Sequence, residues 1–309
     1  MAINNNHIRL KRQNRIKSNW KSPFTFALMF GLGFISLILI ILILWGFFSS
    51  IKTIDDFIDN PVWLPTGMPW NWAWSNYVDV ISQFHVPITT LSGSREVWFE
   101  EMILNSVLFA VIGSLIQTFS VCWVAYLTQR FKYKFSSIIY LVVIFVMIIP
   151  SFNSQASLLK ISRALGVYDT MLSYYFMKIS FTNYFYLVFF AAFRVLPKDY
   201  DESALVDGAG DLVIFFKIIL PLVSGVFLTI FLLSFMGSWN DYMTPIVFMP
   251  SKYTIAYGVF YLVNGNVQGL SRVPLKLAIC YLFSLPILIL FIFFRDRIMN
   301  SVNIGGIKE

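Results

Sequence analysis

The stretch from 196 to 211 is the part of the sequence whose residue types and spacing say most about chemistry. It combines carboxylates with glycines: Asp199, Asp201, Glu202, Asp207, Asp211, Gly208 and Gly210. A glycine-rich loop can bind a dinucleotide, but Gly208-Ala209-Gly210 lacks the third glycine and the preceding strand of that fingerprint. The chain also has no Gly-x-x-x-x-Gly-Lys-Ser/Thr loop, so it cannot hold ATP in the P-loop manner.

Other routes to catalysis have little support in the sequence. An enzyme site needs an acid–base pair, a nucleophile beside a base, or a metal cluster. The two histidines, His7 and His85, are far apart in sequence and cannot form a metal site unaided. Cys122 and Cys280 lie inside long apolar runs, which is typical of small buried hydrophobic residues. We therefore expect no catalytic residue and no metal site.

The same 196–211 stretch is predicted to form a short helix, a turn and a second helix. Pro197 is suited to the first turn of a helix, and the acidic residues after it favour the positive end of the helix dipole. Apolar residues recur there at helical spacing: Tyr200, Ala204 and Leu205. Asp207-Gly208 is a turn signal, and Asp211 can cap the helix that follows. An ordinary surface loop is the plainer alternative.

The composition predicts that these elements belong to a membrane protein. The chain has 309 residues, of which 58% are hydrophobic and 13% charged, and its mean hydropathy is +0.71. A soluble chain carries about 25% charged residues, so this one has about half the expected charge. That balance excludes a soluble enzyme, a nucleic-acid-binding module and a disordered tail, and it implies contact with lipid.

Six stretches are apolar and long enough to cross a bilayer, which takes about 20 residues each. Five lie between charged residues, within 22–51, 102–129, 135–159, 218–240 and 277–294, and the sixth covers about 170–193. The sixth contains Lys178, which either reaches the far membrane surface or lines a polar cavity. Pro150 and Pro286 lie in or near spans and are expected to kink them. The expected fold is all-α, a polytopic membrane protein with six transmembrane helices.

The distribution of basic residues predicts the orientation. The N-terminal tail and the connection around 130–134 are rich in Lys and Arg without acid, so by the positive-inside rule both termini are cytoplasmic. The chain then divides into a basic tail (1–23), a first span (24–48), an extracellular loop (49–101), a core of five helices (102–296) and a cytoplasmic tail (297–309). The extracellular loop is rich in tryptophan, which suits an interfacial aromatic belt, a docking surface for a partner, or stacking on sugar.

One segment resembles a signature of the permease subunits of bacterial ATP-binding-cassette importers. That signature begins Glu-Ala-Ala and has a glycine six residues after the glutamate. Nine intervening residues then separate the glycine from Ile-x-Leu-Pro. The matching residues here are Glu202, Ser203, Ala204, Gly208, Ile218, Leu220 and Pro221. Ser203 replaces the first alanine, which leaves close packing possible. The turn residues Asp207 and Ala209 fit the same pattern.

Further segments resemble the carbohydrate branch of that family, in particular the second subunit of maltose permeases. They are the Arg194 to Ala209 stretch, Gly237-Ser238-Trp239-Asn240-Asp241-Tyr242, and the tail Gly305, Gly306, Ile307 and Lys308. The resemblance implies a type I importer permease fold and a coupling helix at about 198–211 that contacts an ATPase subunit. It also implies that the tail reaches the ATPase pair.

The resemblance implies partners as well. They are a second permease subunit, two ATPase subunits that bind ATP and Mg²⁺, and an extracellular solute-binding protein, with no cofactor in this chain and no nucleic acid. The implied function is import of a carbohydrate across the cell membrane by alternating access. A polyol or glycerol phosphate is the alternative cargo. A secondary transporter would normally show inverted repeats and intramembrane acids, and neither is visible.

The substrate route is harder to predict than the coupling segment. Trp239, Asn240 and Asp241 combine polar groups with a ring near the outer end of the fifth span, so they could line a sugar path. They could equally form the C-terminal cluster of a helix in the interfacial belt.

Overall fold

The computed structural model describes residues 23–90, 93–131, 133–149, 154–265, 270 and 272–302. The predicted basic tail up to residue 22, Pro150, and the tail residues Gly305, Gly306, Ile307 and Lys308 lie outside the described residues. The chain divides into two compact units, Met1–Asn76 with Arg272–Ala278, and Tyr77–Ser271 with Ile279–Glu309. Each unit is described here by itself.

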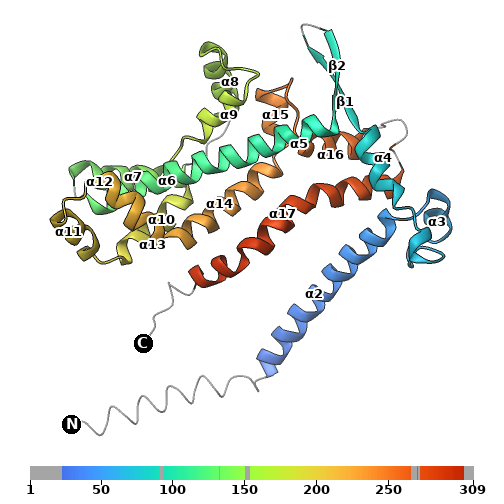
Figure 1. Cartoon of the computed structure of the whole chain (residues 1–309), viewed down its shortest axis with the longest axis horizontal. Coiled ribbons are helices and arrows are strands. Elements are labelled where there is room, and N and C mark those ends of the chain that lie inside the picture. Colours follow the sequence, from blue (N-terminus) through green and yellow to red (C-terminus); the bar gives the residue numbers. More distant parts are fainter. Residues whose placement is uncertain are drawn as a thin grey trace. The chain divides into compact units, whose positions relative to one another are not determined.

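The first unit contains a long apolar helix and the tryptophan-rich loop that follows it (Figure 1). The helix is α2 (Pro23–Ser50), and the loop contains α3 (Ile54–Asp59) and a short 3₁₀ helix (Pro69–Asn71). Asn76 Nδ2 donates hydrogen bonds to the carbonyls of Ser50 (2.8 Å) and Lys52 (2.9 Å), so the loop returns to the end of α2. Within this unit Trp72 packs edge-on against Phe48, with ring centroids 6.0 Å apart.

A two-stranded hairpin follows α4 (Ser75–Gln83). Strands β1 (His85–Thr90) and β2 (Gly93–Trp98) pair antiparallel, with Val86 opposite Val97. Val86, Ile88 and Val97 are buried, so one face of the hairpin carries the apolar residues. The predicted helical fold holds, and this hairpin is an addition that the sequence analysis did not predict.

Helices make up most of the second unit. The first run is continuous: α5 (Phe99–Val107), a π-helical turn (Leu108–Ile112) and α6 (Gly113–Arg130). It is followed by α7 (Lys134–Ile148), α8 (Ser154–Ala164), α9 (Met171–Lys178), α10 (Tyr184–Val195) and α11 (Asp199–Val206). Then come α12 (Asp211–Ile214), a second π-helical turn (Phe215–Ile219), α13 (Leu220–Leu222), α14 (Ser224–Trp239), α15 (Met243–Phe248) and α16 (Ile255–Asn264). The last helix, α17 (Val273–Val302), belongs to the first unit up to Ala278 and to the second unit from Ile279.

Helices long and apolar enough to cross a membrane are fewer than the six predicted spans. In the described part of the chain three qualify, Pro23–Ser50, Phe99–Arg130 and Val273–Asp296, and a fourth forms if the bent pair Asp211–Leu222 and Ser224–Trp239 is one span. The apolar helices α7 and α10 are shorter. Pro286 lies inside α17, as expected.

Two predicted spans differ in detail from the structure. The stretch 170–193 is not one helix, because α9 ends at Lys178 and α10 begins at Tyr184. The fifth span begins as a straight helix at Ser224 rather than after Lys217, because the chain bends by 79° between α13 and α14. Kinks of this size commonly occur at proline and at π-helical turns, and both are present here.

The core of the second unit lies among α6, α10 and the segment that leads into α14. Its fully buried side chains include Tyr186 and Phe189 of α10 and Phe215 of the second π-helical turn. The Thr128 and Tyr186 hydroxyls share a hydrogen bond of 2.7 Å inside this core. This packing fixes the position of the C-terminal end of α6.

Candidate functional site

The short helix α11 ends in a tight turn around Gly208. The Gly208 N–H donates to the carbonyl of Leu205 (3.0 Å), and the Ala209 N–H donates to the carbonyl of Ala204 (2.9 Å). This pair of bonds is a Schellman motif, which requires a left-handed residue just after the helix. Gly208 has φ +80°. The predicted helix and turn are therefore present, and the turn depends on this glycine.

Residues on both sides of the turn pack against the core. Ala204 is 6% exposed and belongs to the core of the second unit, and Ala209 packs against the same core. Ser203, which replaces an alanine of the signature, donates its hydroxyl to the carbonyl of Asp199 at 2.5 Å within α11. Asp211 is the first residue of α12, and Gly210 occupies the N-cap position that we predicted for Asp211. The helix and its turn thus form one compact element seated on the core.

Arg130, the last residue of α6, anchors the start of α11. Its Nε lies 3.2 Å from Asp201 Oδ2, with exposed fractions of 6% and 18% for the two side chains. The guanidinium also donates to the carbonyls of Leu196 (3.3 Å) and Pro197 (3.4 Å). Burial raises the pKa of the Asp201 carboxyl, and Arg130 acts in the opposite direction. One buried cation therefore fixes both the helix and the chain that leads into it.

In the sequence, Arg130 indicates only the orientation of the chain, and Asp201 is only one of several acids near a helix N-terminus. Their pairing spans 71 positions of the chain and depends on how α10 folds back along α6. The available signals for this pair were an arginine at the end of an apolar run and an acid in the 196–211 stretch. Neither residue type specifies its partner, so the contact required the structure.

The second half of the signature forms the bend that follows α11. Ile218 and Leu220 pack against the core, while Pro221 is exposed at the start of α13. Val223 separates α13 from α14, where the chain turns by 79°. Helix α11 is thus connected to the base of α14 through α12, the π-helical turn and α13.

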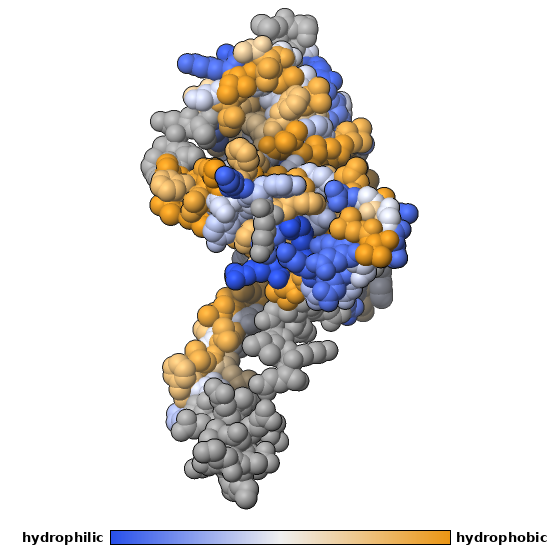
Figure 2. Space-filling view, turned by 90° about the vertical axis from the view of Figure 1, so that its left-hand side faces the viewer, coloured by the Kyte–Doolittle hydropathy of each residue, from blue (hydrophilic) through white to orange (hydrophobic). Residues whose placement is uncertain are grey.

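The outer side of α11 is exposed and carries both charge and apolar side chains. Glu202 is exposed, and its side chain makes no hydrogen bond or ion pair within the described part of the chain. Leu205 is 53% and Val206 88% exposed. Figure 2 is a view of the left-hand side of Figure 1, where α11 and α12 lie. In this view, hydrophilic residues lie beside hydrophobic ones. Such a mixed surface suits contact with another protein.

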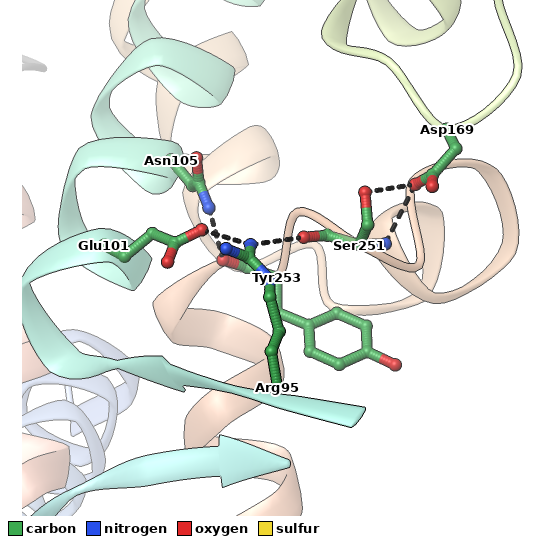
Figure 3. A network of polar contacts seen from close by, with 6 residues as sticks. All are labelled: Arg95, Glu101, Asn105, Asp169, Ser251 and Tyr253. Carbon is green, nitrogen blue, oxygen red and sulfur yellow. Dashed lines mark hydrogen bonds and ion pairs between the residues drawn. The ribbon is translucent and has the colours of Figure 1, made fainter. Parts of the chain in front are cut away.

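A separate polar network joins the hairpin to the loop between α15 and α16 (Figure 3). Arg95 on β2 forms an ion pair with Glu101 on α5 (2.6 Å) and donates to the carbonyl of Ser251 (3.2 Å). Asp169 Oδ1 accepts hydrogen bonds from the backbone N–H and the hydroxyl of Ser251, each at 2.8 Å. Asn105 Nδ2 donates to the carbonyl of Tyr253 at 3.1 Å. Four chain segments are thereby held together at this end of the second unit.

The three residues predicted near a substrate path lie at the end of α14. Trp239 is 1% exposed, and its Nε1 donates to the carbonyl of Phe283 at 2.9 Å. Asn240 caps α14 through its bond to the Met236 carbonyl (2.8 Å), and Asp241 accepts hydrogen bonds from Thr244. Each residue has a structural contact in this conformation, and their role in substrate passage stays a prediction.

Among the residues that the structure describes, no group of three or more His, Cys, Asp or Glu could hold a metal ion.

Comparison with known protein families identifies the family of this chain. Residues 120–303, more than half of the chain, match the family described as the inner membrane component of binding-protein-dependent transport systems. The chain belongs to this family. It is therefore a multi-pass subunit of the cell membrane that serves translocation and works with a binding protein, and it is not an enzyme. The match includes the core of the second unit, α11 and the bend after it.

Individual relatives of this permease come from several bacteria. The diacetylchitobiose uptake system permease protein NgcG of Streptomyces coelicolor is 26% identical over 279 residues, covering 88% of this chain and 85% of the relative. The galactooligosaccharides transport system permease protein GanQ of Bacillus subtilis is 29% identical over 226 residues, covering 70% and 77%.

A solved structure shares the fold of the permease. It belongs to a bacterial ABC transporter involved in the import of the acidic polysaccharide alginate. The TM-score is 0.74 at 19% identity, and the alignment covers 90% of this chain and 98% of that one. The type I importer permease fold predicted from the sequence is thus confirmed.

Proposed function

We propose that this permease is one half of the membrane channel of an ATP-binding-cassette importer that carries an oligosaccharide into the cell by alternating access. The names of its relatives support this cargo, since NgcG is named for diacetylchitobiose and GanQ for galacto-oligosaccharides. The other channel half is a second permease subunit. A solute-binding protein delivers the sugar from outside, and two ATPase subunits, which bind ATP and Mg²⁺, act from inside with both permease termini on their side of the membrane.

In this proposal α11 is the coupling helix that sits on an ATPase subunit. The observation that carries the proposal is the way α11 is fixed: Arg130 holds its start, the Gly208 turn closes its end, and the 79° bend joins it to α14. A helix held at both ends moves as one body, so a shift of the ATPase is transmitted to the membrane helices. Glu202 and Val206 are the exposed residues that meet the ATPase, and the tail around Gly305 and Gly306 adds a second contact.

Substitution of the turn glycine tests this coupling role. A Cβ at Gly208 would meet no atom within 4 Å, yet its φ of +80° is strained for any L residue with a side chain. Gly208→Ala should cost about 1–2 kcal/mol in the turn and reduce uptake of labelled galacto-oligosaccharide or diacetylchitobiose by the assembled complex about tenfold.

Gly210 provides a matched control. A Cβ there also meets nothing within 4 Å, but its φ is −76°, which alanine adopts freely. Gly210→Ala should transport at the unsubstituted rate, with both variants inserted in the membrane to equal levels. Equal transport by Gly208→Ala and Gly210→Ala would contradict a coupling role for this turn.

A further inference from the structure

A break in the helical path between α9 and α10 lies at membrane depth. The residues between them, 179–183, are not helical. Helix α10 has 12 residues and so is about 18 Å long at about 1.5 Å per residue. It ends just before α11, which the proposed function places on the cytoplasmic side. The hydrocarbon layer is about 30 Å thick, so the break lies within it.

The neighbouring helix α6 carries polar side chains at the same depth. Gln117 and Thr118 precede Arg130 by 13 and 12 positions, which corresponds to about 18–20 Å of helix above the cytoplasmic end. Ser114 lies one helical turn further out. The break and these side chains form one layer, which we call the polar layer: Ser114, Gln117, Thr118, Tyr174, Lys178, Ser180, Thr182, Ser234, Ser238 and Asp241.

Five members of the polar layer, on α6, α9 and α14, are linked by contacts with one another. Lys178 Nζ lies 3.5 Å from Gln117 Oε1 and 5.0 Å from the centre of the Tyr174 ring. The Tyr174 hydroxyl donates to Ser238 Oγ at 2.7 Å, and Ser114 reaches the same oxygen at 3.4 Å. Asp241 lies close enough to act electrostatically on Lys178. The ammonium group thus has one long hydrogen bond and no ion pair within 4 Å in the described residues.

Two further hydroxyl groups of the layer have no partner. Thr118 Oγ1 and Ser234 Oγ are buried and form no hydrogen bond in the described part of the chain, on side chains that are 0% and 5% exposed. A buried polar atom without a partner costs about 1–3 kcal/mol. Stability alone therefore does not account for so many polar groups at this depth.

The exposure of the break indicates what it faces. Ser180, Thr182 and Asn183 are half-exposed in this chain, and the Ser180 and Thr182 hydroxyls bond to each other at 3.2 Å. Non-helical backbone cannot face lipid, because its polar groups would lose their hydrogen bonds there, so at membrane depth it packs within protein or lines water. A cation at the end of a broken helix is typical of a solute pathway.

We propose that Lys178, Gln117, Ser180 and Thr182 line the solute passage and hydrogen-bond the hydroxyl groups of the sugar as it crosses. The set contains an ammonium donor, an amide with both donor and acceptor atoms, and two hydroxyl groups, which matches the mixed donors and acceptors of a sugar. This inference rests on the proposed function and names its binding residues.

Cysteine labelling tests the passage without any sugar. In the assembled complex with Cys122→Ala and Cys280→Ala, Thr182→Cys should react with a charged methanethiosulfonate reagent. The control is Val188→Cys on α10, a position of similar or greater exposure in this chain (46%) that carries an apolar residue. We expect Thr182→Cys to react at least about tenfold faster, because a charged reagent enters water but not hydrocarbon. Equal rates, or no reaction at residue 182, would overturn the proposal.

Transport kinetics test the role of Lys178. In proteoliposomes of the assembled complex with labelled galactotriose, Lys178→Met should raise KM about tenfold, since a hydrogen bond to a charged group is worth about 1.5–3 kcal/mol. Lys178→Arg should recover part of the loss, and Lys160→Met, at an exposed lysine on α8, should change nothing.

The two proposals fail in different ways. A KM for Lys178→Met equal to that of the unsubstituted complex would overturn the passage assignment and leave the importer intact. If the unsubstituted complex transports neither galactotriose nor diacetylchitobiose, the proposed cargo is wrong, and the labelling rate of Thr182→Cys still tests the passage. If Lys178→Met does not insert, the labelling experiment decides.

Discussion

Arg130 shows how much a single residue contributes to the position of α11. Its guanidinium is nearly buried and connects α6 to Asp201 and to the chain before α11. A buried ion pair often adds little net stability, because both charges lose water, but removing one partner leaves the other charge unpaired. Arg130 is therefore more important for fixing the position of α11 than for the stability of the whole fold.

Replacing Arg130 should release α11. Arg130→Met keeps an unbranched apolar stem but removes the guanidinium, which leaves the Asp201 carboxylate without its cation at a cost of about 2 kcal/mol. Sugar uptake should fall by at least about tenfold, and Arg130→Met with Asp201→Asn should recover part of the loss. Transport assays with matched membrane levels measure both effects.

Arg295 and Asp296 give the control for that prediction. They form an ion pair at 3.3 Å on α17, with 63% and 84% exposure. Exposed pairs contribute about 0–1 kcal/mol, so Arg295→Met should leave transport unchanged. A normal rate for Arg130→Met would show that the buried cation does not position the helix.

At the scale of helices and strands, the structure consists of short elements tied together by specific contacts. Helix α11 depends on its turn and on Arg130, while the outer loops depend on the network of Arg95, Asp169 and Ser251. Asp169 has φ +61°, a left-handed conformation that Asn and Asp adopt more readily than other residues. Its carboxylate and its backbone are thus both adapted to hold the loop between α15 and α16.

Two substitutions of Asp169 separate these contributions. Asp169→Asn keeps the left-handed preference and an oxygen that accepts from Ser251, so the thermal midpoint of the purified complex should drop only slightly. Asp169→Ala loses the acceptor and strains the backbone, at a cost of about 2–4 kcal/mol. It should lower the midpoint clearly and expose the outer loops to protease. Equal midpoints for the two variants would show that this residue does not hold the loop.

Local sequence signals predicted some of these elements and not others. The helix at 199–206 and its turn were predictable because Pro197, Asp207 and Gly208 act within a few residues of one another. The 79° bend was not, because an apolar run has the same composition whether it is straight or bent. The break at 179–183 had a signal in its polar residues Ser180, Thr182 and Asn183, but the apolar stretches on both sides favoured one continuous span. The hairpin had a usable signal in the alternation of Val86 and Ile88, but this pattern is short beside the long apolar runs of the chain.

At the scale of the whole molecule, the proposed contact between α11 and an ATPase subunit requires that α11 face the cytoplasm. The basic residues between α6 and α7 and the coupling helix are placed inside by the positive-inside rule, and the loop before the hairpin is placed outside. The residues of the candidate site were predicted from the sequence because the signature is local. Their attachment through Arg130 was not, because it joins segments far apart in the chain.

Cysteine accessibility tests this orientation. With the native cysteines replaced by alanine, Asp199→Cys on α11 should react with a membrane-impermeant reagent only after the cells are opened. Asp79→Cys on α4 should react in intact cells. Both side chains lie at exposed or half-exposed positions of polar segments, so each should be labelled once the reagent reaches it. The reverse pattern would invert the topology and remove α11 from the ATPase side.

The central claim is that α11 seats on an ATPase subunit, and site-specific photo-crosslinking measures this directly. A photoreactive amino acid in place of the exposed Glu202 should yield, in the assembled and transporting complex, a covalent product that contains the ATPase subunit. The same amino acid in place of Asp79 should yield none. A transporting complex in which position 202 never crosslinks to an ATPase would contradict the account.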